Sequence, residues 1–249
     1  MDREYLLETL AEDFWSRAGC GPENAADLEA AASWVLPVEI ASVARLCLID
    51  VATRIRNLGV DVALAGRNRR LRGCLIAYQG NGLIMLDAVD PPDERRFTLA
   101  HELAHFLLDY QAPRQRAVAA LGEAILPVLD GLRPPTLEER LHAVLVDAPL
   151  GVLRHLMERP DMGILAGAVL DVEDRADRLA LELLAPASLL LERLHTPQAP
   201  SAFRDRLTSL IEILIAERGL PQALASTYAR YILRQQGGPG FQDWLLGTW

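Results

Sequence analysis

The chain has 249 residues, of which 51% are hydrophobic and 24% are charged, and its formal net charge is −9. This composition excludes wholesale disorder, and the length suits one good-sized core with a small helical addition rather than two large domains. The basic residues are all arginine, and the excess of acidic residues disfavours nucleic-acid binding over a whole face of the protein.

The cysteines and the N-terminus indicate a compartment. Cys20, Cys47 and Cys74 are odd in number, far apart and in no C-x-x-C pair, so a reducing cytoplasm is the simplest one. The N-terminal stretch is acidic and amphipathic and lacks the apolar core of a signal peptide, and no apolar run reaches membrane-spanning length. We therefore expect a cytoplasmic protein with no membrane partner.

Helices are predicted for the first part of the chain. Apolar residues recur at helical spacing over residues 2–18, and a second short helix is expected at about residues 23–34. Pro37 suits the first turn of a third helix, whose apolar positions continue to the capping glycine Gly59.

A small antiparallel sheet is predicted next. Residues 60–64, 74–78 and 83–86 are short runs of strand-forming residues, and Gly80-Asn81-Gly82 predicts a tight turn between the last two. The arginine-rich residues 67–72 are expected to form a solvated loop.

The rest of the chain is predicted to be helical. Proline and acid at residues 91–94 favour the start of a helix that runs to about Tyr110. Helices broken by proline are expected up to residue 170, with a capping box at residues 136–139. Further helices are predicted at residues 172–184, 202–217 and 222–234.

His101-Glu102-Leu103-Ala104-His105 is an H-E-x-x-H motif on the helix predicted after residue 91. Residues i and i+4 lie one above the other on an α-helix, so both imidazoles can reach one zinc ion. Glu102 follows His101 by about 100° of helix rotation, which places its carboxylate beside the metal as a general base for water. The apolar residues around the motif favour a buried active-site helix over a helix with two unrelated histidines.

A third zinc ligand is needed, because zinc in a hydrolytic site usually has three protein ligands and one open position. His142, His155 and His195 are candidates on chemistry alone, although such histidines more commonly cap, pack or face solvent. The acidic residues 171–177 are better candidates, because they open an apolar helix that can pack antiparallel to the first.

Two blocks of the sequence resemble the ImmA/IrrE family of metallo-endopeptidases. The first is residues 96–105, and the second, residues 173–186, is similar to that family's E-x-x-A-N-x-F-A-x-x-L-L-x-P helix. The resemblance implies that Glu173 is the third zinc ligand. Asp177 stands where the family pattern has asparagine, and this change spares the implied ligands and the base.

The resemblance also implies a function. Members of this family are typically cytoplasmic proteases that cut a helix-turn-helix repressor and so switch on mobile-element or stress-response genes. We therefore expect a protein substrate, such as a transcriptional repressor, and no direct nucleic-acid partner. A strand such as residues 83–86, if exposed, is expected to align an extended peptide by strand addition.

Two other functions fit the same residues. A catalytically silent zincin-like module, such as a sensor or an antitoxin-like protein, is suggested by the helix-glycine-helix pattern at residues 207–231. The presence of Glu102 favours an enzyme, because a scaffold needs no base beside the metal. A zinc hydrolase acting on a non-peptide amide or ester also remains possible from the sequence.

Supporting groups for the reaction are left open. Tyr78, His142, His155, Tyr228 and nearby arginines are all conceivable electrophilic partners, and the sequence selects none of them. Asp109 follows His105 by one turn and is either a partner of that histidine or, more commonly for such a residue, part of a solvated helix end.

We predict an α+β fold, with a mainly helical zincin-like core, a small antiparallel sheet and helical additions. The expected domains are a helical extension at residues 1–35, a catalytic domain at residues 36–190 with a helical insertion at about 112–170, and a helical segment at residues 191–249. His101, His105 and Glu173 are predicted to bind Zn²⁺, with Glu102 as the catalytic base. The substrate, the scissile bond and the oligomeric state are not predicted.

Overall fold

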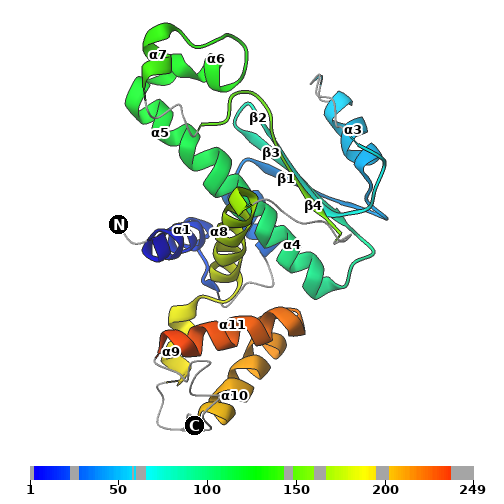
Figure 1. Cartoon of the computed structure of the whole chain (residues 1–249), viewed down its shortest axis with the longest axis vertical. Helices are drawn as coiled ribbons and strands as arrows, with labels where there is room; N and C mark the ends of the chain where they lie inside the picture. Colours follow the sequence, from blue (N-terminus) through cyan, green and yellow to red (C-terminus); the bar gives the residue numbers. More distant parts are fainter. Residues whose placement is uncertain are drawn as a thin grey trace. The chain divides into compact units, whose positions relative to one another are not determined.

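The computed structural model in Figure 1 describes residues 3–22, 28–57, 59, 66–142, 148–159, 167–194 and 202–236. Its contacts divide the chain into two units, Glu29–Ala180 and a second one made of Met1–Leu28 with Leu181–Trp249. The structure is mainly helical with one small sheet, which confirms the predicted α+β class. The domain boundaries expected from the sequence stay a prediction.

The sheet of unit Glu29–Ala180 has four strands in the order β1-β3-β2-β4. The strands are β1 (Val38–Val43), β2 (Leu71–Tyr78), β3 (Asn81–Asp87) and β4 (Leu153–Glu158). The β2-β3 hairpin was predicted, and its turn is made by Gln79 and Gly80, both with positive φ as a two-residue hairpin turn requires. β2 pairs antiparallel with β3 and β4, whereas β1 pairs parallel with β3, so the sheet is mixed.

Strand β1 lies where a helix from Pro37 to Gly59 was predicted, and that prediction was wrong in its first half. Val38 to Val43 pair in register with Gly82 to Asp87, and only the following residues form a helix, α3 (Leu48–Asn57). The apolar spacing fits both structures, and long-range pairing with β3 decides between them. The strand predicted at residues 60–64 lies outside the described residues.

The stretch predicted as wholly helical before residue 170 contains strand β4, so this prediction also needs correction. Its first part is helical as expected, with α5 (Ala112–Leu121), a short 3₁₀ turn (Glu123–Ile125), α6 (Leu126–Leu129) and α7 (Leu137–Leu141). The predicted capping box is present, because Thr136 and Glu139 hydrogen bond reciprocally at the start of α7. β4 then pairs with the edge of β2 that β3 leaves open.

The arginines of residues 67–72 were predicted to form a solvated loop, but three of their side chains form ion pairs with residues of the sheet or of α4 (Pro92–His105). Arg70 donates to the buried carboxylate of Asp87, Arg72 pairs with Glu94, and Arg69 pairs with Glu158. Arg70, together with backbone N–H groups and Arg159, outweighs the effect of burial and lowers the pKa of Asp87 to about 2.

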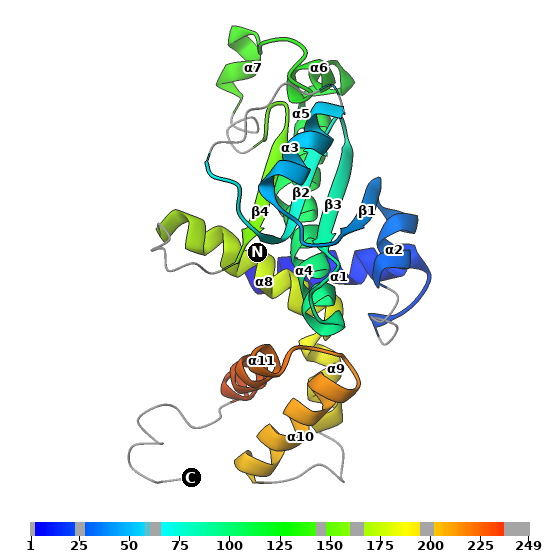
Figure 2. The ribbon, with the colours of Figure 1, turned by 90° about the vertical axis from the view of Figure 1, so that its right-hand side faces the viewer.

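Helices cover both faces of the sheet. α3 packs its buried Val51 and Ile55 against one face, in a core with Cys74 and Ile76. α4 (Pro92–His105) covers the other face, as Figure 2 shows. Gly73 allows this close approach, because a Cβ at that position would lie 2.5 Å from Thr98 Cγ2 on α4.

Two further segments of the chain adjoin the metal-motif helix. A π-helical segment (Phe106–Gln111) continues α4 directly, and such turns are frequent at functional sites. α8 (Gly167–Leu184) begins five residues before the helix predicted at residue 172, and Figure 1 shows it beside α4.

The described secondary-structure elements of the second unit are all helices. The unit contains α1 (Arg3–Ala18), the end of α8, α9 (Ala187–Leu194), α10 (Phe203–Ala216) and α11 (Gln222–Gln235). The indole N–H of Trp15 donates to the carbonyl of Leu183, and the buried Tyr228 hydroxyl donates to Glu182 and to the carbonyl of Ala185.

The remaining described helix, α2 (Leu28–Val35), covers the end of the helix predicted at residues 23–34. No helix in the described part of the chain is long and apolar enough to cross a membrane.

Candidate metal centre

Helix α4 presents the H-E-x-x-H motif toward the interior. Proline at its first turn and the acidic Asp93 and Glu94 favour its start, and every residue from Thr98 to His105 is buried. His101 and His105 are each only 2% exposed, and their Nε2 atoms lie 3.1 Å apart. The i,i+4 spacing therefore aims two imidazole nitrogens at one point, as predicted.

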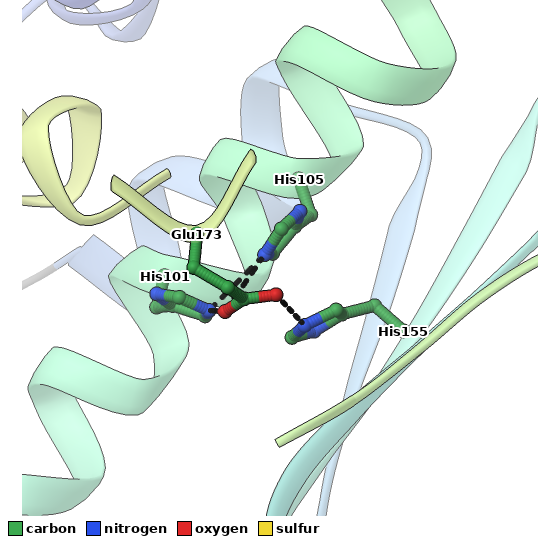
Figure 3. Close-up of side chains that lie close together, drawn as sticks. All are labelled: His101, His105, His155 and Glu173. Carbon is green, nitrogen blue, oxygen red and sulfur yellow. Dashed lines mark hydrogen bonds and ion pairs between the residues drawn. The ribbon is translucent and has the colours of Figure 1, made fainter. Parts of the chain in front are cut away.

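Glu173 reaches the same point from α8. Its Oε2 lies 3.2 Å from Nε2 of His101 and 3.8 Å from Nε2 of His105. Figure 3 shows the carboxylate facing both imidazoles. The structure thus brings together the three residues predicted as metal ligands.

The spacing of these atoms fits a metal ion. Ligand atoms that surround zinc as a tetrahedron at about 2.0–2.1 Å are about 3.3–3.4 Å apart. The three separations of 3.1, 3.2 and 3.8 Å are close to this value. Two imidazoles and a carboxylate are also a donor set that zinc uses in hydrolytic sites.

Each motif histidine donates a hydrogen bond to an aspartate on the side of the ring away from the centre. Nδ1 of His101 donates to Asp177 over 2.8 Å, and Nδ1 of His105 donates to Asp109 over 2.7 Å. These bonds fix the tautomer that leaves the Nε2 lone pairs directed to the centre. Asp109 is therefore a partner of His105, one of its two sequence alternatives, and it also pairs with Arg175 over 3.0 Å.

The predicted base, Glu102, lies beside the histidine pair and is fully buried. Its Oε2 accepts a hydrogen bond from Nδ1 of His155 over 2.9 Å. Its Oε1 has no hydrogen-bond partner among the described residues. A buried carboxylate oxygen without a partner is costly, so Oε1 keeps an unused capacity to accept a hydrogen bond.

His155 is the site residue that the sequence did not select. It lies on β4, opposite Leu75 of β2, on the sheet face that α4 covers. Its Nε2 is 3.0 Å from Oε1 of Glu173, and its ring stacks on that of His105 with centroids 3.7 Å apart. Together with His101, His105 and Glu173, it offers one of four ligand atoms that lie within 4.8 Å of one another.

The close contacts between histidines and carboxylates shift the pKa values of both kinds of group. Burial opposes charge on His101, but hydrogen bonds to Asp177 and Glu173 outweigh it and raise its pKa to about 9. Burial likewise opposes charge on His155, but Glu102 and Glu173 raise its pKa to about 10. The three histidines hold the pKa of Glu173 well below its usual range. A metal cation binds such a site by displacing protons.

The other candidate residues lie away from this centre or outside the described residues. His142 is exposed after α7, the Tyr78 hydroxyl accepts a hydrogen bond from Gln79, and Tyr228 is buried in the second unit against Glu182. His195 lies outside the described residues. Of the named residues that the sequence left open as partners for the reaction, His155 is the one that the structure places at this centre.

Comparison with known proteins agrees with the motif. The family model for the IrrE N-terminal-like domain, Peptidase_M78, matches residues 57–123. The search of the curated proteins gave no match. The family match contains α4 with the H-E-x-x-H motif, and it ends before the residues that bring His155 and Glu173 to the centre.

Proposed function

The match supports an ImmA/IrrE family metallopeptidase, and from this premise we propose that the chain is a zinc-dependent endopeptidase. The observation that carries the proposal is the convergence of His101, His105 and Glu173 on one point, with the buried carboxylate of Glu102 beside it. A metallopeptidase needs this combination of three ligands and one base.

The two imidazoles and Glu173 would hold the zinc ion. When bound, zinc acts as a Lewis acid that polarises the peptide carbonyl and makes water more acidic. Asp177 and Asp109 accept hydrogen bonds from Nδ1 of His101 and of His105, and these bonds would keep both imidazoles oriented toward the zinc ion.

Glu102 would move the proton. Hydrolysis adds the hydroxyl of water to the carbonyl carbon and the remaining proton to the leaving amine as the C–N bond breaks. Glu102 takes that proton from the attacking water and passes it to the amine. Its buried, partnerless Oε1 supports this role, and a catalytically silent module would have no reason to retain it.

We further propose that the substrate is a helix-turn-helix transcriptional repressor in the cytoplasm, as in the family that the chain resembles. The three cysteines are free of disulfides, which supports a reducing compartment. The expectation that residues 83–86 align the substrate is wrong, because β3 is a central strand. β4 is the edge strand beside the metal centre, so strand addition is proposed there instead.

Cleavage by the zinc-loaded full chain tests this proposal. The protein is incubated with a pool of quenched fluorescent peptides and with an extract of its host cells, in which new protein N-termini are sequenced. We expect cleavage of a peptide bond by the wild type and none by Glu102→Gln, although that variant retains zinc. Cleavage that persists in Glu102→Gln, or no cleavage by the loaded wild type in either assay, contradicts the proposal.

A further inference from the structure

His155 connects the base to a metal ligand. Its Nδ1 is 2.9 Å from Oε2 of Glu102, and its Nε2 is 3.0 Å from Oε1 of Glu173. Both neighbours are carboxylate oxygens, which accept hydrogen bonds, so both ring nitrogens act as donors. His155 thus uses its whole hydrogen-bonding capacity on two carboxylates of the centre.

The two motif histidines are bonded differently. Each of them gives Nδ1 to an aspartate outside the centre. Their Nε2 atoms face the interior, where that of His101 lies 3.2 Å from Oε2 of Glu173. Figure 3 shows that Glu173 turns one oxygen to His101 and His105 and the other to His155. His155 differs from both at Nδ1, which is bonded to the base Glu102 rather than to an aspartate outside the centre.

We propose that His155 is a positioning residue for the catalytic base, whose carboxylate it fixes through the hydrogen bond to Oε2. This inference rests on the proposed endopeptidase function. Oε2 of Glu102 is bonded to His155, and Oε1 has no partner among the described residues. A buried carboxylate that loses this bond is free to rotate and is penalised for its burial.

The fold gives His155 a rigid support. β4 pairs with β2 on both sides of it, through Cys74 with Leu156 and Ile76 with Arg154. Its ring is further fixed by stacking on His105. The segment between the two blocks that resemble the family thus supplies a residue of the centre, through a strand that lies beyond the match to the family domain.

Two substitutions separate the two hydrogen bonds of His155. The side-chain amide of His155→Asn can donate near the place of Nδ1, toward Glu102, whereas that of His155→Gln reaches the place of Nε2, toward Glu173. We expect His155→Ala and His155→Gln to lower kcat on the peptide pool by about 10–100-fold with little change in KM and zinc content. His155→Asn should restore much of kcat, and His142→Asn, at an exposed histidine, should change nothing.

A spectroscopic test needs no substrate. In the full chain loaded with ¹¹³Cd and labelled with ¹⁵N-histidine, we expect one-bond cadmium–nitrogen coupling at His101 and His105 and none at His155. Coupling at His155, or zinc loss in His155→Asn as large as in His101→Ala, makes it a ligand and overturns the inference. Equal kcat in all His155 variants overturns it as well.

Failure of the two proposals can be told apart. A wild type that binds neither zinc nor cadmium refutes the endopeptidase and the positioning role together. A wild type that binds zinc and cuts peptides, but whose His155→Asn variant is no more active than His155→Ala, refutes the positioning role alone.

Discussion

The candidate metal centre has two halves that differ in how deeply the protein buries them. The half on α4 is packed in the core, with His101 and His105 each 2% exposed and Glu102 fully buried. The half on α8 reaches water, because the side chains of Glu173 and Asp177 are 29% and 48% exposed. Loss of His101 or His105 on α4 should therefore affect both metal binding and folding, whereas loss of Glu173 on α8 should affect metal binding with little effect on folding.

The largest expected effect is loss of a ligand from either half. We expect His101→Ala to weaken zinc binding by more than the roughly 10–100-fold that loss of a supporting group costs, and Glu173→Ala to do the same. Calorimetric titration with zinc measures both variants. Glu102→Gln is the matched control, because the base is no ligand and its variant should keep wild-type affinity. If Glu173→Ala binds zinc with wild-type affinity, Glu173 is not a ligand and α8 is not part of the centre.

A test of packing sharpens the contrast between the halves. Gly73→Ala should destabilise the metal-free protein by about 1–3 kcal/mol, because its Cβ would collide with Thr98 on α4. Asp174→Ala on α8, whose side chain is 62% exposed, should stay within about 0.5 kcal/mol of wild type. Urea unfolding measures both. Equal stability of the two variants would show that the α4 interface is less tightly packed than this structure indicates.

Substitution of Asp177, which accepts a hydrogen bond from Nδ1 of His101, should have a smaller effect on zinc affinity. Asp177→Ala removes the acceptor for Nδ1, and because the side chain is nearly half exposed we expect the lower end of the usual range, a loss of about 10-fold in zinc affinity. Asp177→Asn keeps an acceptor and should lose less. Asp174→Asn, one turn away from the contact, is the control. The role of Asp177 is excluded if its Ala variant binds zinc as Asp174→Asn does.

The smallest expected effect is on the pH dependence of the metal-free protein. The pKa of His101 rises from 6.5 to about 9 on folding, so its contribution to stability is complete below pH 6.5 and is lost as the pH rises through 9. Urea unfolding between pH 6 and 10 should therefore show a steeper decline for wild type than for Asp177→Ala, which lacks one cause of the shift. Parallel curves would contradict this assignment.

The sequence predicts the α4 half of the centre well and the remainder unevenly. His101, Glu102 and His105 follow from spacing within one helix, because helical geometry alone brings them together. Glu173 came from the resemblance to a family and not from its spacing, since its distance to the histidines depends on how α8 packs on α4. No local pattern specifies such a contact between segments about seventy residues apart.

His155 shows what local patterns miss. Residues 153–158 contain none of the β-branched residues that favour strands, so they give no clear strand signal. The weak signal that exists is alternation, because Leu153, His155 and Met157 share one face of the sheet. The same limit explains β1, where helical spacing after Pro37 was overruled by pairing with β3.

Diffraction from crystals of the zinc-loaded protein, measured on both sides of the zinc absorption edge, shows whether His101, His105 and Glu173 hold one zinc ion. We expect one anomalous peak per chain, about 2.0–2.2 Å from Nε2 of His101, from Nε2 of His105 and from a carboxylate oxygen of Glu173. No peak at this point, or an ion held without Glu173, would contradict this expectation.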